Sequence, residues 1–86
     1  MKNLIVEIQP FDFKQNIYVF DNGILTSTIN TTMKDLPQKI LTTAAAEEIT
    51  NISIRGAVDF TQKIKEEVRV EEVTKYGKHI LEIDLV

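Results

Sequence analysis

The stretch from residue 35 to residue 64 decides the fold of this chain. It contains two similar segments, DLPQKI at 35–40 and DFTQKI at 59–64, on either side of the apolar segment NISIR at 51–55. Each similar segment begins with an aspartate and has a glutamine three residues later, which is the pattern of a helix N-cap with a capping box. The segment between them has the β-branched composition of a strand. We therefore predict helix, strand, helix, with Asp35 and Asp59 as the N-cap residues.

Apolar residues recur at helical spacing after each predicted cap. The first helix should end near Glu48, and its apolar stripe is Leu36, Ile40, Leu41, Ala44 and Ala45. The second helix carries Phe60, Ile64 and Val68 at a spacing of four. Gly77 suits the position after a helix that ends at about Lys75. The alternative is that residues 68–70, which alternate like a strand, end this helix early.

Four further segments have the composition of strands, namely residues 3–9, 17–20, 24–30 and 79–86. Pro10 ends the first of them because proline removes a backbone donor. Asn22-Gly23 is a strong hairpin signal, since both residues tolerate positive φ. As a two-residue turn it would pair Phe20 with Leu25 and Tyr18 with Ser27.

The predicted order of elements is β-β-β-α-β-α-β. Right-handed crossovers between parallel strands place both helices on the same face of the sheet. One face of the parallel strands is apolar (Leu4, Val6, Ile8, Ile52, Ile54, Leu81, Ile83 and Leu85), and the other is largely polar. A sheet covered on both faces would be apolar on both. We therefore predict a two-layer α/β fold with a mixed five-stranded sheet in the order 3-2-1-4-5 and one bare face.

This order of elements is similar to the core of the ribonuclease H-like fold, which actin-type ATPases share. The resemblance covers almost the whole chain, as topology only. It implies metal-binding carboxylates whose nearest counterparts here are Glu7, Glu47 or Glu48, and Asp59. The last acidic helix of the nucleases is absent, and residues 21–23 form an ordinary turn rather than the Gly-rich phosphate-binding hairpin of the actin group. The resemblance thus implies a stripped, non-catalytic member, and a fold alone does not give a function.

Length and composition exclude several classes of protein. The chain has 86 residues, a net charge of −3 and no cysteine. We expect one domain over residues 1–86, without disulfides or thiolate metal sites. It has no signal-peptide pattern and no apolar run of about 20 residues, so we expect a cytoplasmic protein without a membrane segment. The acidic balance disfavours nucleic-acid binding.

The predicted bare face carries a polar row of candidate binding residues, namely Glu7, Arg55, Glu82 and Asp84. The row has three interpretations, which are a charge ladder that keeps the face soluble, a protein interface, and a site for a charged ligand. A Mg²⁺ site at Glu7 and Asp84 is opposed by the charge of Arg55 expected between them. We predict no metal and no cofactor.

No residue is predicted to be catalytic. His79 is a single histidine beside a turn and has no expected carboxylate or serine partner. Ser27 and Ser53 lack any nucleophile motif.

The third strand should lie at an edge of the sheet, where unpaired backbone groups can accept another strand. The candidate residues there are Ile24, Leu25, Thr26 and Thr28. At the opposite edge Glu82 and Asp84 would discourage pairing.

These patterns predict a small non-catalytic interaction or regulatory protein that acts through the polar sheet face or the third-strand edge. Its partner would be another protein or a second copy of itself. The cysteine-free composition, rich in Asn, Ile and Lys, would suit a bacteriophage or mobile-element accessory protein. The alternative is a minimal divalent-metal-dependent nuclease or phosphohydrolase that uses Glu7, Asp59 and Asp84.

Overall fold

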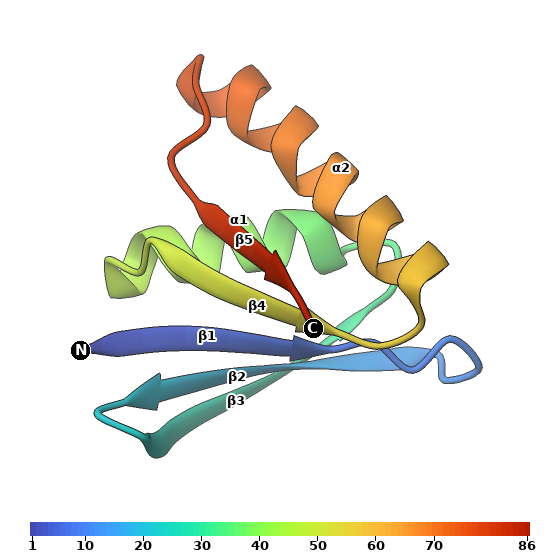
Figure 1. The fold of residues 1–86 in the computed structure, drawn as a ribbon, viewed down its shortest axis with the longest axis horizontal. Coiled ribbons are helices and arrows are strands. Elements are labelled where there is room, and N and C mark those ends of the chain that lie inside the picture. The colour runs from blue at the N-terminus through green and yellow to red at the C-terminus, as the bar shows by residue number, and fades with distance from the viewer.

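Seven elements follow the chain in the predicted order, and the computed structural model describes residues 1–86 without a gap. The strands are β1 (Lys2–Glu7), β2 (Lys14–Asp21), β3 (Ile24–Thr32), β4 (Asn51–Arg55) and β5 (Glu82–Leu85), and the helices are α1 (Leu36–Glu47) and α2 (Val58–Tyr76) (Figure 1). Neither helix is both long enough and apolar enough to cross a lipid bilayer.

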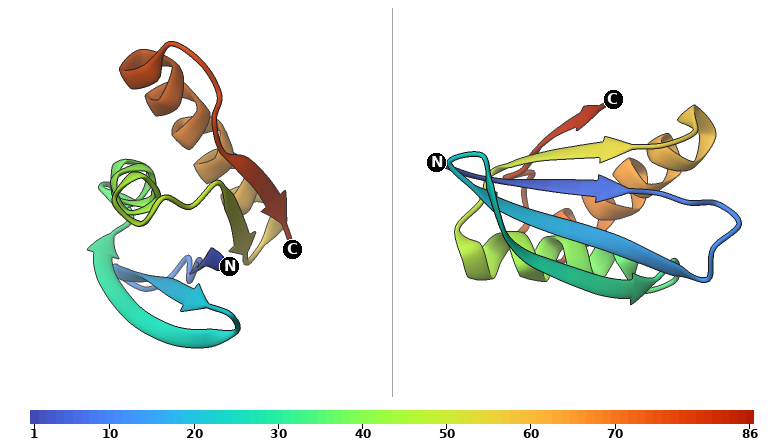
Figure 2. Two further views of the ribbon diagram at one scale, coloured as in Figure 1. Left: turned by 90° about the vertical axis from the view of Figure 1, so that its left-hand side faces the viewer. Right: turned by 90° about the horizontal axis from the view of Figure 1, so that it is seen from below.

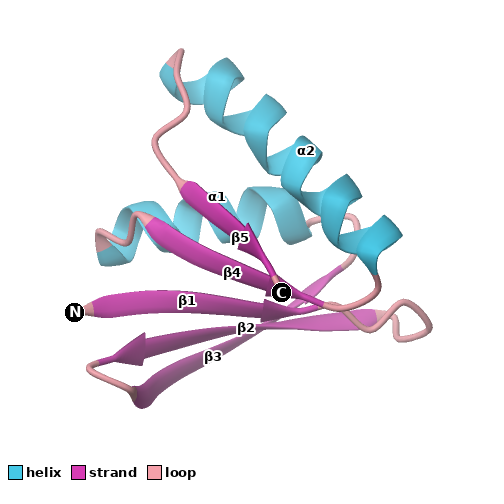
Figure 3. Cartoon of the chain, in the orientation of Figure 1, coloured by secondary structure: helices cyan, strands magenta, loops and turns pink.

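The five strands form one mixed sheet in the order β3-β2-β1-β4-β5, as predicted. β1 pairs antiparallel with β2 and parallel with β4, and β5 extends the parallel side (Figure 3). β3 pairs antiparallel with β2 and forms the opposite edge. Both helices lie on the same side of the sheet, which the left view of Figure 2 shows most clearly.

Alternation along the strands separates a buried face from an open one. Sixteen buried apolar residues form the core between the sheet and the helices. The strands contribute Leu4, Val6, Ile17, Val19, Ile52, Ile54 and Ile83 to it, and Ile8 follows directly after β1. The residues between them, such as Ile5, Ser53 and Arg55, are half-buried or exposed. The predicted two-layer arrangement is therefore confirmed. Leu85 is the exception, since it is exposed near the sheet edge although the strand pattern places it on the core face.

The hairpin between β2 and β3 has the predicted turn but a shifted register. Asn22 and Gly23 both have positive φ (52° and 81°), and Phe20 pairs with Leu25 as expected. Tyr18 pairs with Thr28 rather than with Ser27. The cause is a β-bulge opposite the Val19/Phe20 step, where Thr26 is the extra residue.

β2 also begins earlier than predicted, at Lys14, because Gln15 ties the preceding loop to the strand. The buried Gln15 side chain donates to the carbonyls of Gln9 (2.7 Å) and Asp12 (2.9 Å), and it accepts from the Gln9 amide (2.7 Å). β1 ends at Glu7, two residues before the predicted end.

Both predicted helix caps differ from those observed. Asp35 occupies the N-cap position of α1, but its φ and ψ of −92° and −4° are already helical, and its side chain makes no cap hydrogen bond. Its Oδ2 instead accepts from the Thr32 hydroxyl at 3.2 Å. The N-cap of α2 is Ala57, in an extended conformation, which places Asp59 in the first turn. There the carboxylate is favourable to the helix dipole without being a cap.

The C-terminal part of the chain resolves the open question about α2. The helix continues to Tyr76, and Gly77 follows in the left-handed conformation with φ of 73°. The strand alternative for residues 68–70 is therefore wrong. The last strand begins only at Glu82 rather than at residue 79, because the amides of Ile80 and Leu81 bind a side chain of α2.

Candidate functional site

The four residues of the predicted polar row all lie on the open sheet face. They stand at different register positions, however, so they do not form one row across the strands. Glu7 and Arg55 are register partners on β1 and β4. On β5, Asp84 is opposite Ser53 and Glu82 is opposite Asn51. The ion pairs of the chain lie elsewhere, so no salt bridge joins Glu7 to Arg55. The face therefore lacks the predicted carboxylate-arginine-carboxylate row.

The middle of the open face is less polar than the sequence suggested. Tyr18, Ile5, Ser53 and Asp84 succeed one another across β2, β1, β4 and β5. The first three are half-buried, and Asp84 is exposed. Such a mixture of aromatic, aliphatic and charged side chains is typical of a protein-binding surface rather than of a site for a small ion.

The edge formed by β3 is the longest unpaired backbone edge of the sheet. β3 has nine residues with no charged side chain and no proline. Its first two residues are strongly exposed, Ile24 at 69% and Leu25 at 49%. Thr26 and Thr28 are exposed as well, although Thr26 is the bulged residue and its hydroxyl donates to the Val19 carbonyl at 3.2 Å. Charges, prolines, short length and bulges are the usual means of blocking an edge strand, and of these β3 has only the bulge at Thr26, near the hairpin.

A polar groove lies between the second half of β3 and α1. Its volume is about 650 Å³, and none of its lining residues is hydrophobic: Asn30, Thr31, Thr32, Asp35, Gln38, Lys39 and Thr42. A strand added to β3 would lie along this groove and could bond to side chains of α1 as well as to the backbone of β3.

Thr32 also borders an apolar hollow at the end of β3. This hollow, of about 530 Å³, is lined by Pro10, Asp12, Phe13, Thr32, Met33, Lys34 and Phe60. Phe13 is 81% exposed and the neighbouring Phe11 is fully exposed. The loops that follow β1, β3 and β4 meet at this end of the molecule (Figure 1). Both phenylalanines are therefore open to solvent.

The opposite edge of the sheet is short and acidic. β5 has only four residues, and Glu82 and Asp84 are both exposed on it. An incoming strand would meet these carboxylates. The two edges of one sheet are therefore chemically different.

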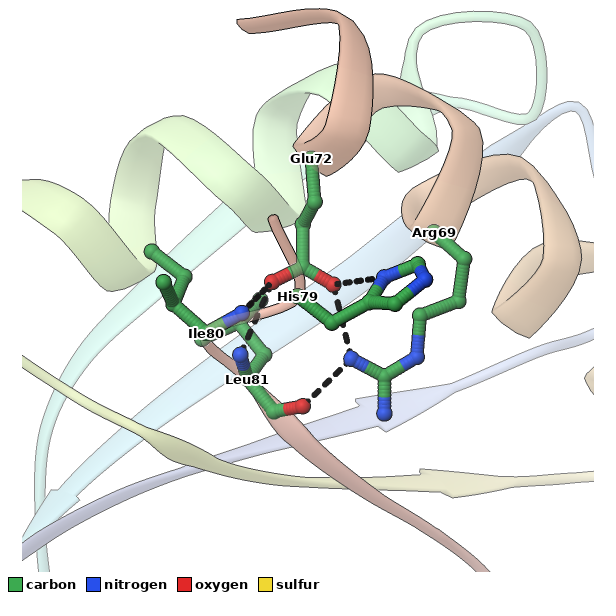
Figure 4. A network of polar contacts seen from close by, with 5 residues as sticks. All are labelled: Arg69, Glu72, His79, Ile80 and Leu81. Atoms are coloured by element: carbon green, nitrogen blue, oxygen red, sulfur yellow. Dashed lines mark hydrogen bonds and ion pairs between the residues drawn. The ribbon is translucent and has the colours of Figure 1, made fainter. Parts of the chain in front are cut away.

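Glu72 of α2 is a fully buried carboxylate that sequence reasoning missed. One of its oxygens accepts from the amides of Ile80 and Leu81, both at 2.8 Å (Figure 4). The other accepts from Arg69 at 2.8 Å and lies 3.8 Å from His79 Nδ1. Arg69 also donates to the Leu81 carbonyl. This cluster fixes the segment between α2 and β5 to the helix.

A signal for Glu72 was present in the sequence. Ile64, Val68 and Glu72 follow one another at a spacing of four, so Glu72 falls on the stripe that α2 buries. A carboxylate on such a stripe needs a buried partner.

The surroundings of Glu72 hold its carboxyl group in the ionised form. Burial raises the pKa of Glu72, but hydrogen bonds from the Ile80 and Leu81 amides and the guanidinium of Arg69 lower it by more. The pKa therefore lies below the ordinary glutamate value of 4.5. No buried side-chain nitrogen or oxygen atom of the chain lacks a hydrogen-bond partner, as expected if the cluster acts as a structural clamp.

We expect this clamp to make the fold acid-sensitive. A carboxylate whose pKa is lower in the folded state stabilises the fold at pH values above its unfolded pKa, near 4.5, and this contribution is lost as the pH falls through the folded-state pKa. Urea denaturation at neutral and acid pH should show that Glu72→Gln loses less stability on acidification than wild type. Arg69 and His79 are the charged and titratable side chains that face Glu72. Equal acid losses in the two proteins would contradict the expectation.

The carboxylates proposed for a metal-dependent enzyme are not gathered at one place. Glu7 lies on β1, Asp59 in the first turn of α2 and Asp84 on β5. The chain holds no group of three or more His, Cys, Asp or Glu side chains arranged to bind a metal ion.

Comparison with known proteins places the fold but not the activity. No protein-family model matches the sequence. No curated protein matches it either. Among solved structures, the chain is similar to a protein from Bacteroides thetaiotaomicron with an actin-like ATPase fold and unknown function, at a TM-score of 0.70 and 14% sequence identity. The match covers 99% of this chain and 32% of that one. The chain thus spans about a third of that protein, and the likeness supports the predicted actin-type topology at the level of fold alone.

Proposed function

We propose that this chain is a non-catalytic protein-interaction domain that receives a partner strand on the outer edge of β3. The observation that carries the proposal is the nine-residue edge without charge or proline, which borders a polar groove. Strand addition to such an edge is a common mode of peptide recognition, in which main-chain hydrogen bonds give affinity and neighbouring side chains give specificity.

The regular part of β3 is long enough for this mode of binding. Residues 27–32 pair with β2 without interruption, whereas the bulge at Thr26 disturbs the ladder nearer the hairpin. Each new backbone hydrogen bond contributes roughly 0.5–1.5 kcal/mol net, so a few of them are needed before the entropy of association is offset. Gln38 and Lys39 of α1 line the groove beside this segment and supply side-chain contacts.

The open sheet face would also take part in binding. A strand added beside β3 extends the sheet, so that the mixed surface around Tyr18 and Ile5 becomes continuous with the partner. By contrast, the edge at β5 presents Glu82 and Asp84 to any incoming backbone.

A lysine at the centre of β3 should abolish partner capture. Thr28 is exposed, so Thr28→Lys leaves the core unchanged while adding a solvated charge to the edge on which the partner strand would pair. We expect tagged wild-type protein to retain a specific partner from source-cell extract and the variant to lose it. Thr74→Lys, the same exchange at an exposed position of α2, is the matched control and should retain the partner.

Two results would contradict the proposal. One is retention of the partner by Thr28→Lys at the wild-type level. The other is loss of the partner with Arg55→Glu but not with Thr28→Lys, which would place binding on the open sheet face instead of the edge.

A further inference from the structure

We infer that the strand received by β3 is the β3 strand of a second copy of this chain, so that two five-stranded sheets join into one continuous antiparallel sheet. This inference rests on the proposed edge function and names its partner. It is carried by the self-complementary chemistry of β3 and of the surfaces at its two ends.

An antiparallel strand can pair with itself only if like residues can stand opposite one another. Near the two-fold axis of such a pair, each residue lies opposite itself or a close neighbour in sequence. The central residues of β3 are Ser27, Thr28, Ile29 and Asn30, none of them charged. Thr and Ser side chains opposite one another stabilise a strand pair, whereas like charges destabilise it. β5 fails this condition, because its central pair of outward residues is acidic.

The two ends of β3 complement each other. Antiparallel pairing brings the Ile24–Leu25 end of each copy beside the Thr32–Met33 end of the other. At the first end Ile24 is 69% exposed, while Leu25 pairs with Phe20 on the open face, and the second end borders the apolar hollow that contains Met33 and Phe13. Ile24 of each copy thus arrives at the apolar hollow of the other, and the symmetry forms this contact twice.

The charges that flank β3 also agree with self-pairing. The nearest charged residue before the strand is Asp21, which is the register partner of Ile24. The nearest one after the strand is Lys34. The same antiparallel arrangement places the Asp21 end of one copy beside the Lys34-Asp35 end of the other, so no block of like charges opposes the pairing. The polar groove beside α1 then receives the side chains of the partner strand that point to the helix side, such as Ser27 and Thr31.

The symmetry limits the register. A two-fold axis perpendicular to the sheet keeps open-face residues opposite open-face residues, and side chains alternate between the faces with a period of two. The axis must therefore pass through a residue position, so that one residue of β3 lies opposite the same residue of the second copy. An axis between two positions would place open-face residues opposite helix-side residues. The middle of β3 offers Thr28, Ile29 and Asn30, of which Thr28 and Asn30 point to the open face, as do their β2 partners Tyr18 and Asn16.

The absence of native cysteine permits a direct test by crosslinking. Directly opposite residues of antiparallel strands have Cα atoms about 4.5–5.5 Å apart, within the range that a disulfide spans. Thr28→Cys alone should crosslink under mild oxidation if the axis is at Thr28, and Asn30→Cys alone if it is at Asn30. If the axis is at Ile29, an equal mixture of the two variants should crosslink while each alone does not. Thr74→Cys is the exposed control on α2.

Sedimentation of the unmodified protein gives an independent readout. Wild type should double its mass as the concentration rises from micromolar to millimolar. Thr28→Lys should dimerise at least about tenfold more weakly, since like charges opposed across an interface cost more than the ~1.4 kcal/mol that equals a factor of ten. Unchanged urea denaturation would show that the lysine variant is folded.

The inference is overturned if wild type stays monomeric at millimolar concentration and no cysteine variant or mixture crosslinks above the Thr74→Cys control. That result does not decide the proposed function, because capture of a different protein by wild type, and its loss with Thr28→Lys, would still assign the edge to a heterologous strand. If the cysteine variants crosslink but the wild-type protein captures no other protein, the chain forms a dimer in which the second copy already occupies the β3 edge.

Discussion

Replacing Glu72 with alanine should lower the free energy of unfolding by about 3–5 kcal/mol, the range typical when one partner of a buried ion pair is removed. The side chain of Glu72 is fully buried and accepts hydrogen bonds from the amides of Ile80 and Leu81. Without it, the buried Leu81 amide loses its partner, and so do the partly buried Ile80 amide and Arg69 guanidinium. Small domains are stable by roughly 5–15 kcal/mol, so the variant should be close to unfolding at room temperature.

Urea denaturation followed by circular dichroism measures this loss. Glu71→Ala is the matched control, because Glu71 is the exposed neighbour of Glu72 in the same helix. Glu72→Gln should be intermediate, since the amide oxygen can still accept a hydrogen bond but carries no charge to pair with Arg69. If Glu72→Ala loses no more stability than Glu71→Ala, the clamp does not hold the segment before β5.

The second large effect is expected at Gly56, the residue that ends β4. Its φ of +144° lies in a region that side chains rarely adopt, and an added Cβ would be 2.9 Å from the Ile8 carbonyl oxygen. The Ile8 amide donates to the Arg55 carbonyl at 2.8 Å, so the backbone on both sides is fixed. Strained φ and overpacking each cost about 1–3 kcal/mol, and we expect Gly56→Asn to lose about 3 kcal/mol.

Gly77 provides the comparison for this substitution. It also has positive φ, +73°, but no atom lies within 4 Å of an added Cβ. Asparagine tolerates the left-handed conformation, so Gly77→Asn should change stability by less than about 1 kcal/mol. Similar urea midpoints for the two asparagine variants would show that the contact with Ile8 yields easily.

The topology could be predicted because it depends on hydrophobic patterns and turn residues that can be recognised in the sequence. Alternation in the segments around Val6 and Ile54 identified the buried face, and the handedness of crossovers then set the strand order. The end of α2 followed from Gly77. These features are local or obey general rules of chain connection, so no knowledge of side-chain geometry was needed.

What could not be predicted depends on contacts between distant residues or on fine backbone geometry. Asp35 and Asp59 have the composition of caps, but capping requires an extended backbone at that residue, which sequence does not state. The bulge at Thr26 shifts every pair from Val19 back to the start of β2, although the turn itself is ordinary. The late start of β5 depends on Glu72, eight residues before Ile80.

The candidate surfaces were predicted in part for the same reason. The sequence placed Glu7, Arg55, Glu82 and Asp84 on the open face, which is a question of strand parity. In the structure Arg55 is opposite neither Glu82 nor Asp84 of β5. This depends on strand register, which the sequence did not predict. The groove between β3 and α1 arises from tertiary packing and had no local signal.

The contrast between the two edges of the sheet has a consequence for how far assembly could go. A fibril grows only when each unit has two adhesive ends, so that one end is always free. In this sheet β3 is the long uncharged edge, while β5 is short and acidic. If two copies joined at β3, the remaining ends would both be β5 edges that repel further strands. Growth would terminate at a pair, and the exposed backbone of β3 would not make the protein prone to amyloid.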